Sequence, residues 1–138
     1  MTVHFQNIVV RHTFPVVFTR HLFSPRNRAL RDAVAREGGT RTHRCLVVAD
    51  RGVLSACPQL PNDILAYFDA HADGLRLVRA PLILPGGEGI KQSAAPVRRM
   101  LAALRAGNIC RHSFCIAIGG GAFLDAAGLA AALFHRGV

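Results

Sequence analysis

Three apolar runs alternate with segments of helical periodicity over most of the chain. The runs Arg44–Asp50, Leu75–Leu84 and Ser113–Ile118 are rich in aliphatic and β-branched residues, as is typical of buried strands. Strand–helix alternation of this kind predicts a parallel sheet with helices on both faces. Because ligands of such sheets bind beyond the carboxyl ends of the strands, the residues that follow each run are the first candidates for a binding site.

The remaining elements complete a single α/β domain over residues 1–138. Val3–Val10 and Thr13–Thr19 are β-branched runs that predict an N-terminal strand pair, and Pro81 predicts a bend or an edge position in its strand. Helices are expected from Ser24-Pro25 (N-cap and first helical residue) to Gly38-Gly39, over Pro61–Ala72, from about Ser93 to Arg105 and over Gly121–Phe134. The expected fold is therefore a Rossmann-like parallel sheet preceded by a strand pair.

Charge and composition exclude several classes of function. The formal net charge is +9, but the 17 basic residues are spread along the chain with only Arg98 and Arg99 adjacent, which disfavours nucleic-acid binding. No apolar run reaches the roughly 18 residues of a membrane span, and no signal peptide is recognisable, so a cytoplasmic location and no membrane partner are expected. The cysteines and histidines lack CxxC, HxH and HExxH spacings. We therefore expect reduced thiols and no metal site built by this chain alone.

A triple glycine follows the last apolar run. Gly119, Gly120 and Gly121 lie between Ile118 and a helix, and Asp125 falls about one turn into that helix. Glycines here let the backbone approach a ligand closely, and the N–H groups of a following helix can hold a diphosphate. The spacing is not the GxGxxG fingerprint, and glycines at such a junction also occur for packing alone. A diphosphate cradle and a packing role both remain open at this point.

The turn that follows Leu84 is also rich in glycine. Gly86 and Gly87 precede Glu88, and the single lysine of the chain, Lys91, stands three residues later. A carboxylate can accept hydrogen bonds from ribose hydroxyls, and an ammonium group can donate to hydroxyl or phosphate oxygens. The alternative is a surface turn with a weak i,i+3 ion pair.

Two further charged residues have a functional and an ordinary interpretation. Asp50 closes a strand, where it could accept hydrogen bonds from a nucleotide or simply cap a turn. Arg136 stands near the end of the last helix, where it could hold a phosphate or complement the helix dipole.

Together these segments resemble the N-terminal, nucleotide-binding domain of the 3-dehydroquinate synthase family of sugar-phosphate cyclases. The resemblance covers nearly the whole chain, and the order and spacing of the segments match. The matching stretches are the strand ending at Asp50, Pro85–Glu88 with Lys91, Arg111-His112-Ser113, Gly119–Gly121 with Asp125 and Gly128, Ala130–Ala132 and Arg136-Gly137-Val138.

The resemblance implies an NAD site. Asp50, Glu88 and Lys91 would hold the adenosine side, and Gly120, Gly121 and Asp125 the diphosphate and neighbouring ribose. Gly86, Gly87 and Gly119 complete the implied cofactor-binding set. Arg136 would reach the substrate phosphate of a neighbouring subunit, which implies a homodimer. The family's reaction is transient oxidation of a phosphorylated sugar by NAD, loss of phosphate, re-reduction and intramolecular aldol closure, with a zinc or cobalt ion.

Some residues depart from the family pattern. Gly52, Ala122 and Leu124 replace residues usual at those places, which points to divergent synthase-like cyclases, including EboD-type proteins. The family's metal ligands lie in a C-terminal helical domain that these 138 residues are expected to lack, so no catalytic or metal-binding residue and no activity of the chain alone are expected. A fragment of an iron-dependent alcohol or glycerol dehydrogenase, or a truncated non-enzymatic nucleotide-binding domain, remains an alternative.

Overall fold

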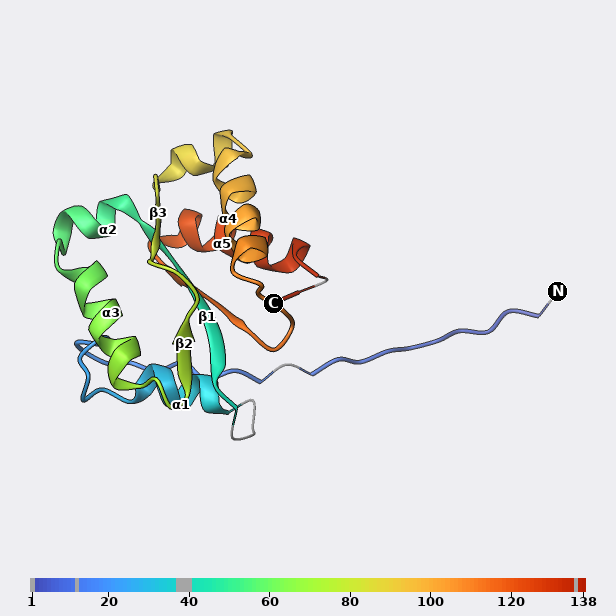
Figure 1. The fold of residues 1–138 in the computed structure, drawn as a ribbon. Coiled ribbons are helices and arrows are strands. Elements are labelled where there is room, and N and C mark those ends of the chain that lie inside the picture. Colours follow the sequence, from blue (N-terminus) through green and yellow to red (C-terminus); the bar gives the residue numbers. More distant parts are fainter. Residues whose placement is uncertain (1, 12, 37–40, 136) are drawn as a thin grey trace.

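The computed structural model describes residues 2–11, 13–36, 41–135 and 137–138, and its centre is a parallel sheet covered by helices (Figure 1). The strands are β1 (His43–Asp50), β2 (Leu75–Leu77), β3 (Leu82–Leu84) and β4 (Phe114–Ile118). The helices are α1 (Ala29–Ala35), α2 (Arg51–Ala56), α3 (Leu60–Ala70), α4 (Ala95–Ala106) and α5 (Gly121–Leu133), with a 3₁₀ segment η1 (Glu88–Gln92). The expected α/β class with a parallel sheet is confirmed.

Strand β1 is the middle of the sheet. β4 pairs with one of its edges, in a register that places Ala49 opposite Ile118. β2 and β3 pair with its first and last residues, Cys45 opposite Leu77 and Asp50 opposite Leu84. Between β2 and β3 the chain moves away from β1, in the stretch that contains Pro81, so the predicted bend is confirmed. The single strand expected over Leu75–Leu84 is therefore split into β2 and β3.

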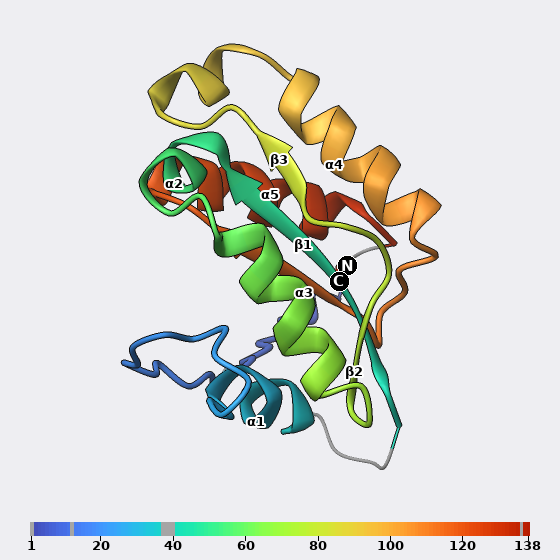
Figure 2. The same cartoon turned by 60° about the vertical axis from the view of Figure 1, so that its left-hand side comes forward.

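The two faces of the sheet carry separate apolar layers because β1 side chains alternate in direction. Cys45 and Val47 pack with residues of α1 and α3, whereas Leu46 and Val48 pack with residues of α4 and α5. In Figure 2, α3 crosses on one side of β1 and α5 lies on the other. This three-layer arrangement fixes the ends of β1, β3 and β4 against the helices that follow them.

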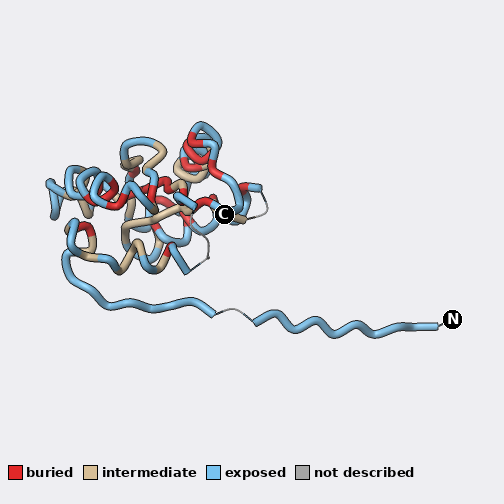
Figure 3. Tube along the Cα trace, turned by 60° about the horizontal axis from the view of Figure 1, so that its bottom comes forward, coloured by how far each residue is buried: buried red, intermediate tan, exposed pale blue. Residues whose placement is uncertain are grey.

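The N-terminal strand pair is not formed, which corrects the expectation drawn from Val3–Val10 and Thr13–Thr19. Residues 2–11 and 13–19 contain no strand, and Phe5 and Phe18 are 95% and 94% exposed. Figure 3 shows this segment running away from the body of the molecule, exposed along its described length. An isolated two-stranded ribbon is marginal in water, and β-branched residues favour an extended backbone without supplying a partner for it.

The first helix begins later than expected. Ser24 is part of a turn, in which the Asn27 N–H donates to the Ser24 carbonyl at 2.8 Å. α1 begins at Ala29, and its N-cap is Arg28, which makes no side-chain capping hydrogen bond. The Ala29 N–H donates to Asn27 Oδ1 at 2.9 Å, just before the helix. The expected end at Gly38-Gly39 lies outside the described residues.

The four cysteines are free, and their surroundings differ. Burial raises the pKa of Cys45 to about 12 and that of Cys115 to about 11. A hydrogen bond with the Ser113 hydroxyl, then one with the His112 backbone, lowers the pKa of exposed Cys110. Within the described part of the chain no helix has the length and apolar character needed to cross a membrane.

These differences predict a native-state order of thiol reactivity. In the folded protein near neutral pH, iodoacetamide should label Cys110 at least about tenfold faster than Cys45 or Cys115, because only the thiolate reacts. The Ser113→Ala variant should move the labelling of Cys110 to higher pH, since it removes the group that stabilises the thiolate. Peptide mass spectrometry gives the rates, with exposed Cys57 as the internal control. Equal labelling of Cys45 and Cys110 would contradict the burial described here.

Candidate functional site

Asp50 joins the end of β1 to α2. It is the N-cap of that helix, and its Oδ1 accepts a hydrogen bond from the Gly52 N–H at 2.8 Å. The capping role considered from the sequence is therefore real. The helix itself was not expected, although an aspartate is a common N-cap residue and could have indicated it.

Gly86 lies directly against this carboxylate. A Cβ built at Gly86 would fall 2.0 Å from Asp50 Oδ2 and 2.1 Å from its Cγ, so only glycine leaves room for the aspartate. The following Gly87 has φ of +73° and ψ of −179°, a conformation that favours glycine. The glycine-rich turn is thus shaped around the end of β1.

Lys91 connects η1 with α5. Its Nζ lies 3.7 Å from Glu88 Oε2 and 3.6 Å from Asp125 Oδ2. All three side chains are exposed, so these pairs contribute little to stability. They do bring the one lysine and the two acidic residues together at the surface, where a ligand can compete for them.

The three glycines at the start of α5 are not equivalent. A Cβ at Gly119 would meet the Phe123 ring at 2.8–3.0 Å, whereas a Cβ at Gly120 or Gly121 would have nothing within 4 Å. Neither Gly120 nor Gly121 has a positive φ. Packing therefore explains Gly119 alone, and the fold itself does not require the other two glycines.

The N-terminus of α5 has donors to offer. Gly120 is the N-cap and makes no side-chain capping hydrogen bond. The first N–H groups of a helix lack partners within it, so those that follow Gly120 can donate to an anion. An open backbone and an uncapped helix end occur together at this place.

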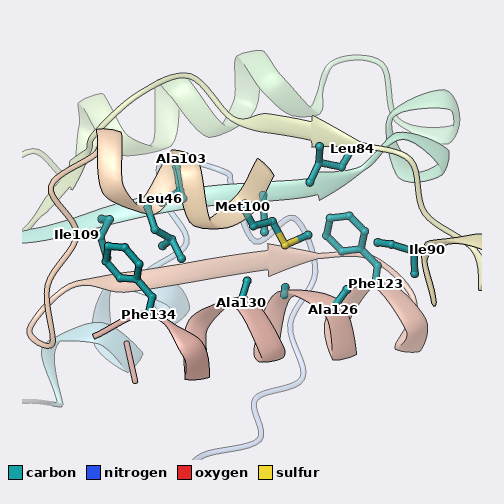
Figure 4. Close-up of a cluster of buried hydrophobic side chains, with 13 residues drawn as sticks. Leu46, Leu84, Ile90, Met100, Ala103, Ile109, Phe123, Ala126, Ala130 and Phe134 are labelled. Carbon is teal, nitrogen blue, oxygen red and sulfur yellow. The ribbon is translucent and has the colours of Figure 1, made fainter. Parts of the chain in front are cut away.

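The strand ends bring these segments to one edge of the sheet. Asp50 pairs with Leu84, the last residue of β3, and the neighbouring Ala49 pairs with Ile118, the last residue of β4. The next residues of those two segments, Pro85 and Gly119, therefore lie at the same edge as Asp50. Figure 4 shows Ile90, Phe123 and Leu84 packed together at one end of the apolar layer, which anchors η1 beside the first turn of α5. The predicted convergence of the three candidate segments is confirmed.

Two expectations concern residues or groups beyond this edge. Arg136 lies outside the described residues, so its place is not assigned. Among the described residues, no group of three His, Cys, Asp or Glu side chains is arranged to hold a metal ion. The described part of the chain therefore does not fit a zinc or cobalt site, and we derive no chemical step through one.

Comparison with known proteins identifies similar sequences and structures. Residues 81–138 match the family model described as 3-dehydroquinate synthase N-terminal. A 3-dehydroquinate synthase of Rhodopseudomonas palustris (strain BisB18) is 37% identical over 95 residues, which are 69% of this chain and 23% of that protein.

A solved structure supports the same assignment. ValA, a 2-epi-5-epi-valiolone synthase from Streptomyces hygroscopicus subsp. jinggangensis 5008 with NAD+ and Zn2+ bound, aligns with a TM-score of 0.70 at 26% identity. The match covers 95% of this chain and 32% of that one. The family resemblance is confirmed, and the chain spans about a quarter to a third of the length of these relatives.

Proposed function

We propose that this chain, which is homologous to the N-terminal NAD-binding domain of 3-dehydroquinate synthase-like sugar-phosphate cyclases, binds NAD at the edge where β1, β3 and β4 end. The observation that carries the proposal is the open backbone at Gly120 and Gly121, which no packing contact and no positive φ requires. A diphosphate placed there would receive N–H groups from the start of α5.

The remaining residues of the site would orient the rest of the cofactor. Asp50 and Glu88 supply carboxylates that can accept from ribose hydroxyls, and Lys91 can donate from between Glu88 and Asp125. NAD, when bound, supplies a hydride acceptor. The chain's own part is to hold the cofactor's charged and hydroxyl groups in fixed positions on a rigid sheet edge.

We propose the complete cyclase reaction only for whole proteins of this family. There, NAD-dependent oxidation of a phosphorylated sugar, phosphate loss and aldol closure would use residues of a metal-binding domain, in a homodimer to which Arg136 contributes, in the cytoplasm. For these 138 residues alone we expect cofactor binding without turnover. Release of inorganic phosphate from a heptulose phosphate by this polypeptide would contradict that expectation.

Lys91→Gln tests the site directly. The variant should weaken NAD binding by about three- to tenfold, because it removes a positive charge that can donate hydrogen bonds to the cofactor's oxygens. Its unfolding transition should hardly move, since both ion pairs of Lys91 are exposed. Isothermal titration calorimetry gives the affinities, with exposed Arg99→Gln as a control of equal charge change. A folded protein that shows no saturable heat with millimolar NAD would overturn the proposed function.

A further inference from the structure

A second cluster of basic side chains lies at the opposite end of the sheet from the proposed NAD site. A pocket of about 230 Å³ is lined by Arg41, His43, Arg111, His112 and Ser113, together with Phe114 and Val138. His43 begins β1 and Phe114 begins β4, so the pocket lies roughly 23 Å along β1 from Asp50. Among the residues that the structure describes, no acidic side chain lines it.

His43 is an unusual residue to find in this position. It is only 4% exposed, and its Nδ1 is buried with no hydrogen-bond partner in the described part of the chain. Its ring packs edge-on against Phe114, with 5.3 Å between ring centroids. A buried polar atom without a partner costs stability, and native structures contain few of them. His43 thus lines the pocket as a buried imidazole whose hydrogen-bonding capacity is not fully used by the described residues.

The two arginines give the pocket a positive potential. Arg111 Nε donates to His112 Nε2 at 3.3 Å, which leaves the other N–H groups of its guanidinium free to meet a ligand. The pKa of adjacent Cys110 is lowered mainly by Ser113, and the charges of Arg44 and Arg111 contribute in the same direction. A second hollow that shares Arg41 and His43 also contains Arg28 and Arg31, but these two arginines are paired with Asp32 and Asp73, which makes that hollow less suited to an anion.

We propose that Arg41, His43, Arg111 and His112 form a binding site for a small oxyanion of the phosphate type. Guanidinium forks match phosphate oxygens in pairs, and two of them with an imidazole can contact one tetrahedral anion from several sides. The volume corresponds to about eight water molecules, which fits a phosphoryl group and is too small for a dinucleotide. The site is separate from the NAD site and does not depend on it.

The test uses inorganic phosphate as the probe. Titration of the whole chain at constant ionic strength should shift the His43 side-chain signals saturably in heteronuclear NMR. The double variant Arg41→Gln/Arg111→Gln should weaken this binding at least about tenfold, and Arg99→Gln, on the exposed side of α4, by less than about twofold. Neither variant should alter NAD affinity, which keeps this proposal distinct from the proposed function.

Parallel titrations distinguish the possible sources of the anion. Glucose 6-phosphate tests a phosphoryl group carried by a larger molecule, acetate tests a carboxylate, and chloride tests charge alone. Binding of inorganic phosphate or glucose 6-phosphate well above that of acetate and chloride supports the proposal. Equal weak effects of all four anions, or phosphate shifts that persist in the double variant, would overturn it.

Discussion

Gly121→Ala is expected to stabilise the folded protein and to weaken NAD binding at the same time. Gly121 is the first residue of α5, and a Cβ there has nothing within 4 Å. Alanine in a helix is favoured over glycine by up to about 1 kcal/mol, so the free energy of unfolding should rise by about 0.5–1 kcal/mol. The same methyl group would stand where the diphosphate is proposed to approach the backbone. NAD affinity should therefore fall at least about tenfold.

The opposite signs of these two effects make the measurement decisive. Urea unfolding gives the stability and calorimetry gives the affinity. Gly128→Ala is the matched control, because Gly128 is an exposed glycine further along α5 whose Cβ position is also open. It should gain a similar stability and keep its NAD affinity. If Gly121→Ala binds NAD as tightly as the unchanged chain, the backbone at this position is not a diphosphate cradle.

The strand that the sequence predicts most directly is β1, which is buried on both faces. Continuous aliphatic runs such as the one over β1 carry that signal themselves, because every residue of the run is needed in one core layer or the other. The N-terminal runs have the same local composition and form no strand in the described residues. Local composition reports a preference for extended backbone, whereas strand formation depends on a partner that composition does not specify.

Among the expected helices, the start of α1 was the one placed clearly too early. Ser24 and Asn27 are both good capping residues three positions apart, and the sequence alone favours the one followed by proline. In the fold, the helix begins after Arg28, and Asn27 Nδ2 donates to Thr19 Oγ1 at 2.9 Å and to the Arg20 carbonyl at 3.0 Å. These contacts belong to the turn that precedes the helix, and a periodicity argument cannot include them.

The candidate site, too, could be predicted from the sequence only in part. Its location followed from topology, since parallel strands bring their carboxyl ends to one edge. The separate roles of the glycines did not follow, because Gly119, Gly120 and Gly121 are identical in sequence. They are distinguished by Phe123, a residue four positions further along, whose ring fills the space beside Gly119 only.

Gly86→Ala is expected to damage both the fold and the site. The added methyl group would fall 2.0–2.3 Å from the carboxyl atoms of Asp50, so the whole carboxyl group has to move. Asp50 would then lose its hydrogen bond from Gly52, and loss of an N-cap lowers the free energy of unfolding by about 1–2 kcal/mol. Because Asp50 and the turn leading to Glu88 are displaced together, NAD affinity should also fall at least about tenfold.

Two companion variants separate these effects. Asp50→Asn keeps a good N-cap and removes the charge, so its stability should stay within about 0.5 kcal/mol while NAD binding weakens. Gly89→Ala adds the same methyl group three residues further along, where nothing lies within 4 Å, and should change neither quantity. Thermal unfolding and NAD calorimetry on all three variants decide the matter. Normal stability and normal NAD affinity in Gly86→Ala would show that the contact between Asp50 and Gly86 is not part of the cofactor site, because a carboxylate that holds a ribose cannot be displaced without loss of binding.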